Sequence, residues 1–167
     1  MAERNSQRGE AETPPFRSVA FLLSSLGYAV SRRFHQLLRP LELEPGEFAL
    51  LRTVAASEGE SQHALAERLH ISPSWMVSIV DELERRELLA RKPHAHDRRV
   101  RTLHLTASGR KLLRQAERSA LQFDRRVADP LTEAELRQLL DLLGRVASGL
   151  ELDPGAHAAL REHGSPV

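Results

Sequence analysis

The sequence contains no cysteine, and aromatic residues make up only 4% of it. Without cysteine the chain forms no disulfide bond, binds no metal through thiolates and senses no oxidant through a thiol. With so few aromatic rings, leucine, valine and alanine have to fill the core, and this composition favours helices. No apolar run approaches the roughly 20 residues that span a bilayer, and residues 1–15 lack the apolar core of a signal peptide. We therefore expect a cytoplasmic protein that does not bind membranes.

The chain has almost no net charge, but its charged residues are unevenly distributed. Its 24 basic and 23 acidic residues give a formal charge of +1. Between residues 61 and 111, ten basic residues stand against six acidic ones, and five of the eight histidines also lie there. Nucleic-acid-binding domains concentrate positive charge in this way. This middle segment is therefore the candidate DNA-binding part of the chain.

The N-terminal part of the sequence predicts a disordered arm followed by a long helix. Residues 1–15 are polar and end in two prolines, which is typical of a disordered segment. Apolar residues then recur every three or four positions from Val19 to Leu38, and Pro40 ends this pattern. The predicted helix is apolar along nearly its whole length, so it needs a partner along its whole length.

Two further helices are expected on the C-terminal side. One begins after Thr106 and ends near Ala128, and the last opens with a capping box formed by Thr132 and Glu135. Residues 153–167 predict a loose tail. The first and last helices carry more apolar surface than a lobe of about 50 residues can cover, which favours burial between two copies of the chain. We therefore expect a homodimer.

The segment between these helices predicts a winged helix-turn-helix. Its expected elements, in order, are a helix from Pro45, a short helix capped by Ser61, a helix opened by Ser72 and Pro73 that runs to about Arg86, and two strands at 88–92 and 100–105. The second helix of the pair is sized to enter a major groove. The hairpin can reach the flanking backbone or the minor groove.

The stretch from Ser61 to Lys111 resembles the MarR family of winged helix-turn-helix regulators. The resemblance is carried by residues 64–69 (Ala-Leu-Ala-Glu-Arg-Leu), 71–74 (Ile-Ser-Pro-Ser), 80–86 (Val-Asp-Glu-Leu-Glu-Arg-Arg), 97–99 (Asp-Arg-Arg) and 103–109 (Leu-His-Leu-Thr-Ala-Ser-Gly). The wing sequence that leads into Leu-Thr-x-x-Gly (residues 105–109) is quite specific to this family. The flanking helices extend the resemblance to about residues 17–150.

The resemblance implies a mainly α fold with a small β-hairpin wing. In domain terms, it implies a DNA-binding lobe at 44–106 and a helical dimerisation lobe formed by residues 16–43 and 107–152. It further implies a homodimeric transcription regulator, a repressor by expectation, on a palindromic site of double-stranded DNA. Two lobes on a two-fold axis predict a palindrome of roughly 16–20 base pairs.

Site residues follow from the resemblance in the same way. Asp97 is expected to pair with Arg99 and to hold it for the minor groove. The candidate DNA contacts are Ser61, Ser72, Ser74, Trp75, Val77, Ser78, Arg85, Arg98, Arg99 and Arg101. The family also implies a small aromatic or phenolic effector between the lobes, with Tyr28, Arg32, His35, Phe48 and Arg52 as candidate lining residues.

The expected recognition helix departs from its relatives. Where they commonly carry Thr-Val-Thr-Arg, residues 75–78 are Trp-Met-Val-Ser, and no Arg, Asn or Gln lies on the first two turns. Bidentate reading of G or A from this helix is therefore not expected, and base discrimination should be modest. Trp75 has two interpretations, contact with thymine methyl groups or packing in the core. Glu87 stands where relatives have Gly, which predicts either a left-handed conformation at that helix end or a helix that runs on, with the first strand starting later.

The same residues are compatible with two other functions. A winged-helix module that binds protein, with Trp75 as its anchor, is the main alternative. A metal-responsive regulator would use histidines, yet His94, His96 and Asp97 at a hairpin tip give at most an open site. Neither a catalytic spacing nor a Gly-rich phosphate loop is present, so we expect no enzyme activity and no cofactor.

Overall fold

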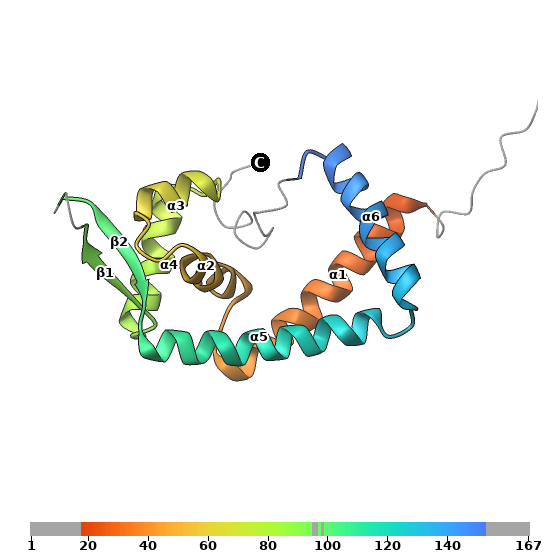
Figure 1. Ribbon diagram of the computed structural model, residues 1–167, viewed down its shortest axis with the longest axis horizontal. Helices are drawn as coiled ribbons and strands as arrows, with labels where there is room; N and C mark the ends of the chain where they lie inside the picture. Colours follow the sequence, from red (N-terminus) through yellow and green to blue (C-terminus); the bar gives the residue numbers. More distant parts are fainter. Residues whose placement is uncertain (1–17, 95–96, 98, 153–167) are drawn as a thin grey trace, which may run out of the picture. The chain divides into compact units, whose positions relative to one another are not determined.

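A computed structural model describes residues 18–94, 97 and 99–152 (Figure 1). The chain divides into two compact units, one up to Arg33 and the other from Phe34 onward. The described part of the first unit is most of helix α1 (Val19–Leu38), and the last residues of α1 belong to the second unit. The predicted N-terminal arm and C-terminal tail lie outside the described residues.

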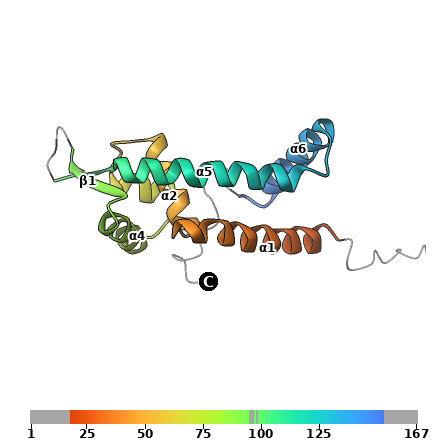
Figure 2. The same ribbon diagram turned by 90° about the horizontal axis from the view of Figure 1, so that it is seen from below.

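The second unit is mainly helical with one β-hairpin, as the sequence predicted. Its elements are η2 (Arg39–Leu41), α2 (Pro45–Ala56), α3 (Gln62–Arg68), α4 (Pro73–Arg85), β1 (Leu89–Pro93), β2 (Arg101–Leu105), α5 (Ala107–Ala128) and α6 (Glu133–Gly149). The two strands are antiparallel, with Arg91 opposite Leu103. Helix α2 contacts both α5 and β2, and β1 lies beside α4 (Figures 1 and 2).

Side-chain caps begin the helices where the sequence predicted. The hydroxyl of Ser61 accepts from the backbone N–H of Ala64, and that of Ser72 from Trp75. Thr132 and Glu135 form the expected capping box. These bonds satisfy backbone donors that the first turn of a helix leaves without a partner. At Pro40 the prediction was incomplete, because a short 3₁₀ turn, η2, follows α1 before the chain turns.

Glu87 ends α4 in the left-handed conformation that its position predicted. Its φ is 55°, and the backbone N–H of the next residue, Leu88, bonds to the carbonyl of Leu83. This turn delays the first strand, which starts at Leu89, one residue later than expected. A non-glycine residue in this conformation costs about 1 kcal/mol.

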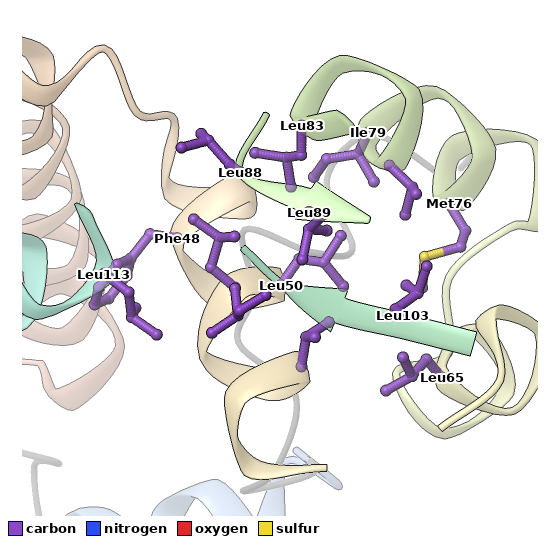
Figure 3. Close-up of a cluster of buried hydrophobic side chains, with 14 of the residues drawn as sticks. Phe48, Leu50, Leu65, Met76, Ile79, Leu83, Leu88, Leu89, Leu103 and Leu113 are labelled. Atoms are coloured by element: carbon purple, nitrogen blue, oxygen red, sulfur yellow. The ribbon is translucent and has the colours of Figure 1, made fainter. Parts of the chain in front are cut away.

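A single apolar core holds the winged helix-turn-helix together (Figure 3). Fully buried side chains come from every element around it: Leu50 from α2, Leu65 from α3, Met76 and Leu83 from α4, Leu89 from β1 and Leu103 from β2. Helix α5 adds Leu113 and Ala116. Close packing of this kind resists sliding of one element on another, so α3, α4 and the hairpin keep a fixed relation.

The loop before α3 pairs with β2 and adds a short third segment beside the two strands. The N–H of Gly59 donates to the carbonyl of Leu103, and the N–H of Leu103 donates to the carbonyl of Glu60. Glu58 reinforces this segment, because its carboxylate accepts from the N–H of Leu105 and lies 2.6 Å from the Arg110 guanidinium. The start of α3 is thereby tied to the base of the wing.

Two helices expose apolar side chains that the described residues do not cover. On α6 no residue is buried, and Leu139, Leu140, Leu142, Leu143 and Val146 are exposed. Within the first unit, Val19, Phe21, Leu22, Leu26 and Val30 of α1 are also exposed. Contiguous apolar surface on a small protein usually marks an interaction site.

Candidate nucleic-acid interface

Helix α4 presents one polar, exposed face and one buried face. Met76, Ile79, Val80 and Leu83 point into the core. The residues at the opposite helical positions are exposed, and they are Ser74, Val77, Ser78, Asp81 and Arg85. The predicted contacts Ser74, Val77 and Ser78 therefore lie together on the solvent side of the helix.

Trp75 is half-buried and packs against the core. Of its two interpretations, packing is the one that the structure supports. This placement also weakens the alternative of a protein-binding module, because that alternative needs Trp75 as an exposed anchor. Ser72, three residues before Trp75, is the N-cap of α4, and its hydroxyl lies 3.2 Å from that of Ser74.

The wing tip is organised by Asp97, through a different contact from the one expected. The Asp97 carboxylate accepts from the backbone N–H of Arg99 at 2.9 Å, and this bond fixes the local turn. The ion pair between the two side chains stays a prediction, since no such pair is found among the described residues. Arg98 lies outside the described residues, as do residues 95 and 96 of the predicted tip.

A cleft of about 440 Å³ runs between the start of α3, the first turns of α4 and the wing. Four predicted contacts line it, namely Ser61, Val77, Arg99 and Arg101. Both arginines are exposed. Gln62 and His63 also line the cleft, and the sequence reasoning missed them because their place in α3 gave no sign that they face the wing.

Arg85 is exposed at the far end of α4, but its guanidinium is engaged within the helix. It binds both oxygens of Glu82, at 3.0 and 2.6 Å. This bond lowers the pKa of Glu82 and raises that of Arg85. Contact of Arg85 with DNA stays a prediction.

Arg91 forms the densest polar cluster of the interface, which sequence reasoning also missed. From β1, its guanidinium reaches Asp81 and Glu84 on α4 at 2.6 Å each, and its Nε donates to Gln62 on α3 at 3.0 Å. Its backbone N–H donates to Glu84 as well. Burial disfavours the charge of Arg91, but the hydrogen bonds to Asp81 and Glu84 outweigh this effect and raise its pKa. The pKa of Glu84 is lowered mainly by the hydrogen bond from the backbone N–H of Arg91 and, to a smaller extent, by the Arg91 guanidinium.

The predicted effector-pocket residues are divided between the two units. Tyr28 and Arg32 belong to the first unit, where Tyr28 is exposed. In the second unit, Phe48 is buried and packs edge-on against Phe34, with the Arg52 guanidinium 5.7 Å above its ring. His35 lies 3.3 Å from Glu44. A common pocket for the five residues stays a prediction.

Two other expectations concern metals and membranes. Within the described residues, no group of three His, Asp or Glu side chains is placed to hold a metal ion. None of the helices in that part of the chain has the length and apolarity to cross a bilayer.

The comparisons with known proteins agree on one family. The model of the MarR family matches residues 43–100. The chain is 32% identical over 119 residues to a putative transcriptional regulatory protein for the hcr operon of Thauera aromatica, covering 71% of this chain and 72% of that protein. It is 30% identical over 130 residues to an HTH-type transcriptional repressor of Mycobacterium tuberculosis, covering 78% of this chain and 94% of that protein.

Two solved structures have the same fold as this chain. The transcriptional repressor CouR, bound to a 23-mer DNA duplex, matches with a TM-score of 0.70 and 29% identity, over 78% of this chain and 92% of that one. CouR from Rhodococcus jostii bound to p-coumaroyl-CoA matches with a TM-score of 0.66. The winged helix-turn-helix, its sequence motifs and these relatives lead to one conclusion: the chain belongs to the MarR family of transcription regulators.

Proposed function

We propose that this regulator is a homodimeric repressor that binds a palindromic operator through α4 and the wing. The observation that carries the proposal is the cleft beside α4, into which Arg99 and Arg101 of the wing bring positive charge. Positive charge at this place suits duplex DNA, because contacts of cationic side chains with the anionic backbone supply a large share of the affinity. The exposed face of α4 then lies toward the major groove.

Base contacts on that face are few. Ser74 and Ser78 offer hydroxyls, and Val77 offers a methyl surface for thymine. None of them makes a bidentate pair with a base, so discrimination between sequences rests largely on the wing and on DNA shape. We assign Arg98 and Arg99 to the minor groove at either end of the operator.

Dimerisation follows from the uncovered apolar residues of α1 and α6. A helix such as α6, with no buried residue of its own, gains stability only by packing on another surface. A second copy of the chain supplies an identical surface, and a two-fold interface is self-complementary. The two DNA-binding lobes of such a dimer match the two halves of a palindrome.

We also propose relief of repression by a small aromatic or phenolic effector, in the cytoplasm. The support is the relative CouR, whose structures hold a DNA duplex in one case and p-coumaroyl-CoA in the other. In the second unit, Phe48 with Arg52 above its ring, together with His35, are the residues assigned to the effector.

Fluorescence anisotropy with the duplex that flanks the gene tests DNA binding. The wild type, Arg99→Ala and Arg118→Ala should be titrated at several salt concentrations. Arg118 is an exposed arginine of α5, so its variant controls for the change in net charge. We expect affinity to fall steeply with salt, and Arg99→Ala to weaken binding roughly tenfold. Absence of binding to any duplex at low salt would overturn the proposed DNA binding and favour the alternative function, a protein-interaction module.

A further inference from the structure

An acidic residue stands in the middle of the face that α4 turns to DNA. Asp81 follows Ser74 by two turns of helix and precedes Arg85 by one. Its side chain is 59% exposed. Glu84 flanks it on the same side toward β1. Two carboxylates near a phosphate backbone oppose binding, so an interface that keeps them needs a compensating charge.

Arg91 supplies that charge from another element. Its Nη2 lies 2.6 Å from Asp81 and its Nη1 lies 2.6 Å from Glu84, while its own side chain is 20% exposed. The third arm of the guanidinium, Nε, donates to Gln62 at the start of α3. One planar group therefore joins three elements of the interface: the helix before the turn, the recognition helix and the first strand of the wing.

We propose that Arg91 is a positioning residue for operator binding, which acts without touching DNA. It offsets one of the two negative charges of Asp81 and Glu84 on the face of α4, and its three-way contacts set the angle of α4 against α3 and the wing. This inference rests on the proposed function, because it assumes that the exposed face of α4 meets DNA.

Arginine is suited to both roles, and lysine to only one. A guanidinium donates in fixed directions within one plane, so it can hold two carboxylates and an amide oxygen at once. An ammonium group carries the same charge but cannot keep the three contacts in that geometry. Arg91→Lys therefore retains the charge and loses the geometry, whereas Arg91→Gln loses both.

The double variant Asp81→Asn with Arg91→Gln separates charge from structural damage. It restores the net charge of the face but restores none of the lost contacts. If Arg91 only stabilised the fold, adding Asp81→Asn would bring back no affinity. If Arg91 also masks a carboxylate from the phosphates, adding Asp81→Asn recovers part of the affinity, most clearly at low salt.

The experiment measures DNA anisotropy at three salt concentrations and urea unfolding in the same buffers. Arg118→Gln serves as the control for net charge. We expect Arg91→Gln to weaken binding at least 30-fold at low salt, and the double variant to recover about a third of that loss on a logarithmic scale. Arg91→Lys should weaken binding about fivefold at every salt concentration. Affinities are compared only where unfolding shows each variant to be folded.

Wild-type affinity for Arg91→Gln would overturn the proposal, as would a double variant no tighter than Arg91→Gln. Wild-type affinity for Arg91→Lys would overturn the geometric role. These failures differ from failure of the proposed function, in which the wild type itself would not bind the duplex and Arg99→Ala would change nothing.

Discussion

A Cβ atom on Gly109 would lie 2.0 Å from the carbonyl oxygen of Leu88. The first turn of α5 and the base of β1 are therefore in direct backbone contact. Thr106 completes the joint, because its hydroxyl accepts from the N–H of Gly109 and donates to the carbonyl of Glu87 at 2.5 Å. The joint gives a physical reason for the Leu-Thr-x-x-Gly motif: threonine caps the helix, and glycine lets it approach the wing.

Gly109→Ala should therefore destabilise the protein although alanine is the better helix former. The methyl group meets backbone that cannot rotate away, so the helix and strand have to separate, at a cost of about 3 kcal/mol. Urea unfolding measures this loss. Ser108→Ala is the matched control, because Ser108 is exposed in the same turn and its replacement should change stability by less than about 0.5 kcal/mol. Equal stability of the two variants would contradict the close approach.

Glu87→Gly should stabilise the protein by about 1 kcal/mol. The residue has a φ of 55°, a conformation that glycine adopts without steric cost. Glu87→Ala is the control, since alanine retains the strain and should give no gain. A similar gain from both variants would show that the glutamate charge, and not the backbone, is unfavourable. Thermal unfolding at one protein concentration is sufficient to rank the three proteins.

The local signals in the sequence predicted the elements that carry the interface. Ser61, Ser72, Thr106 and Thr132 each act on a backbone N–H three residues ahead, so their role can be read from neighbouring residues alone. The left-handed turn at Glu87 was predicted from the resemblance, because relatives carry Gly at that helix end.

The polar contacts between elements could not be predicted in this way. Arg91 and Gln62 are far apart in the sequence, and their contact depends on how α3 packs against the hairpin. The available signal was an arginine on a predicted strand that follows a helix with two acidic residues. Many arginines in proteins fit that description. At the wing, the family pattern named a side-chain pair of Asp97 with Arg99, which stays a prediction; the bond from the backbone N–H of Arg99 to Asp97 depends on the exact turn, which the pattern does not specify.

Stability should fall in acid partly through Glu84. Its pKa is lowered from the usual 4.5, first by the N–H of Arg91 and then, against desolvation, by the guanidinium. The folded protein thus holds the proton less tightly than the unfolded chain. The stabilisation is complete above pH 4.5 and is lost as the pH falls through the lower, folded value.

Glu84→Gln gives the corresponding measurement. The variant should be less stable than the wild type at pH 7, and the difference should shrink as the pH falls below about 4.5. Urea unfolding at pH 7, 5.5, 4.5 and 3.5 would follow it. A difference that stays constant with pH would show that the carboxylate contributes nothing through its charge. Glu133→Gln, on an exposed residue in the first turn of α6, is the control for removing one carboxylate.

The proposed dimer makes α6 the most sensitive place for an added charge. Leu140 is 61% exposed in the single chain, amid Leu136, Leu139 and Leu143 on one face of the helix. Leu140→Asp would bury a carboxylate in the apolar contact between two copies, which is too costly to retain. We expect sedimentation equilibrium to report a monomer for this variant and a dimer for the wild type.

Gln138→Asp is the matched control, because Gln138 lies with Asp141 and Arg145 on the polar face of α6. It should remain dimeric. The monomeric Leu140→Asp protein should also bind a full palindrome much more weakly than the wild type, since each half-site is then bound independently. Its affinity for a duplex with one half-site should change little, because the residues of α4 and the wing are untouched. A Leu140→Asp protein that stays dimeric would place the interface elsewhere on the chain and remove the support that α6 gives to the proposed repressor.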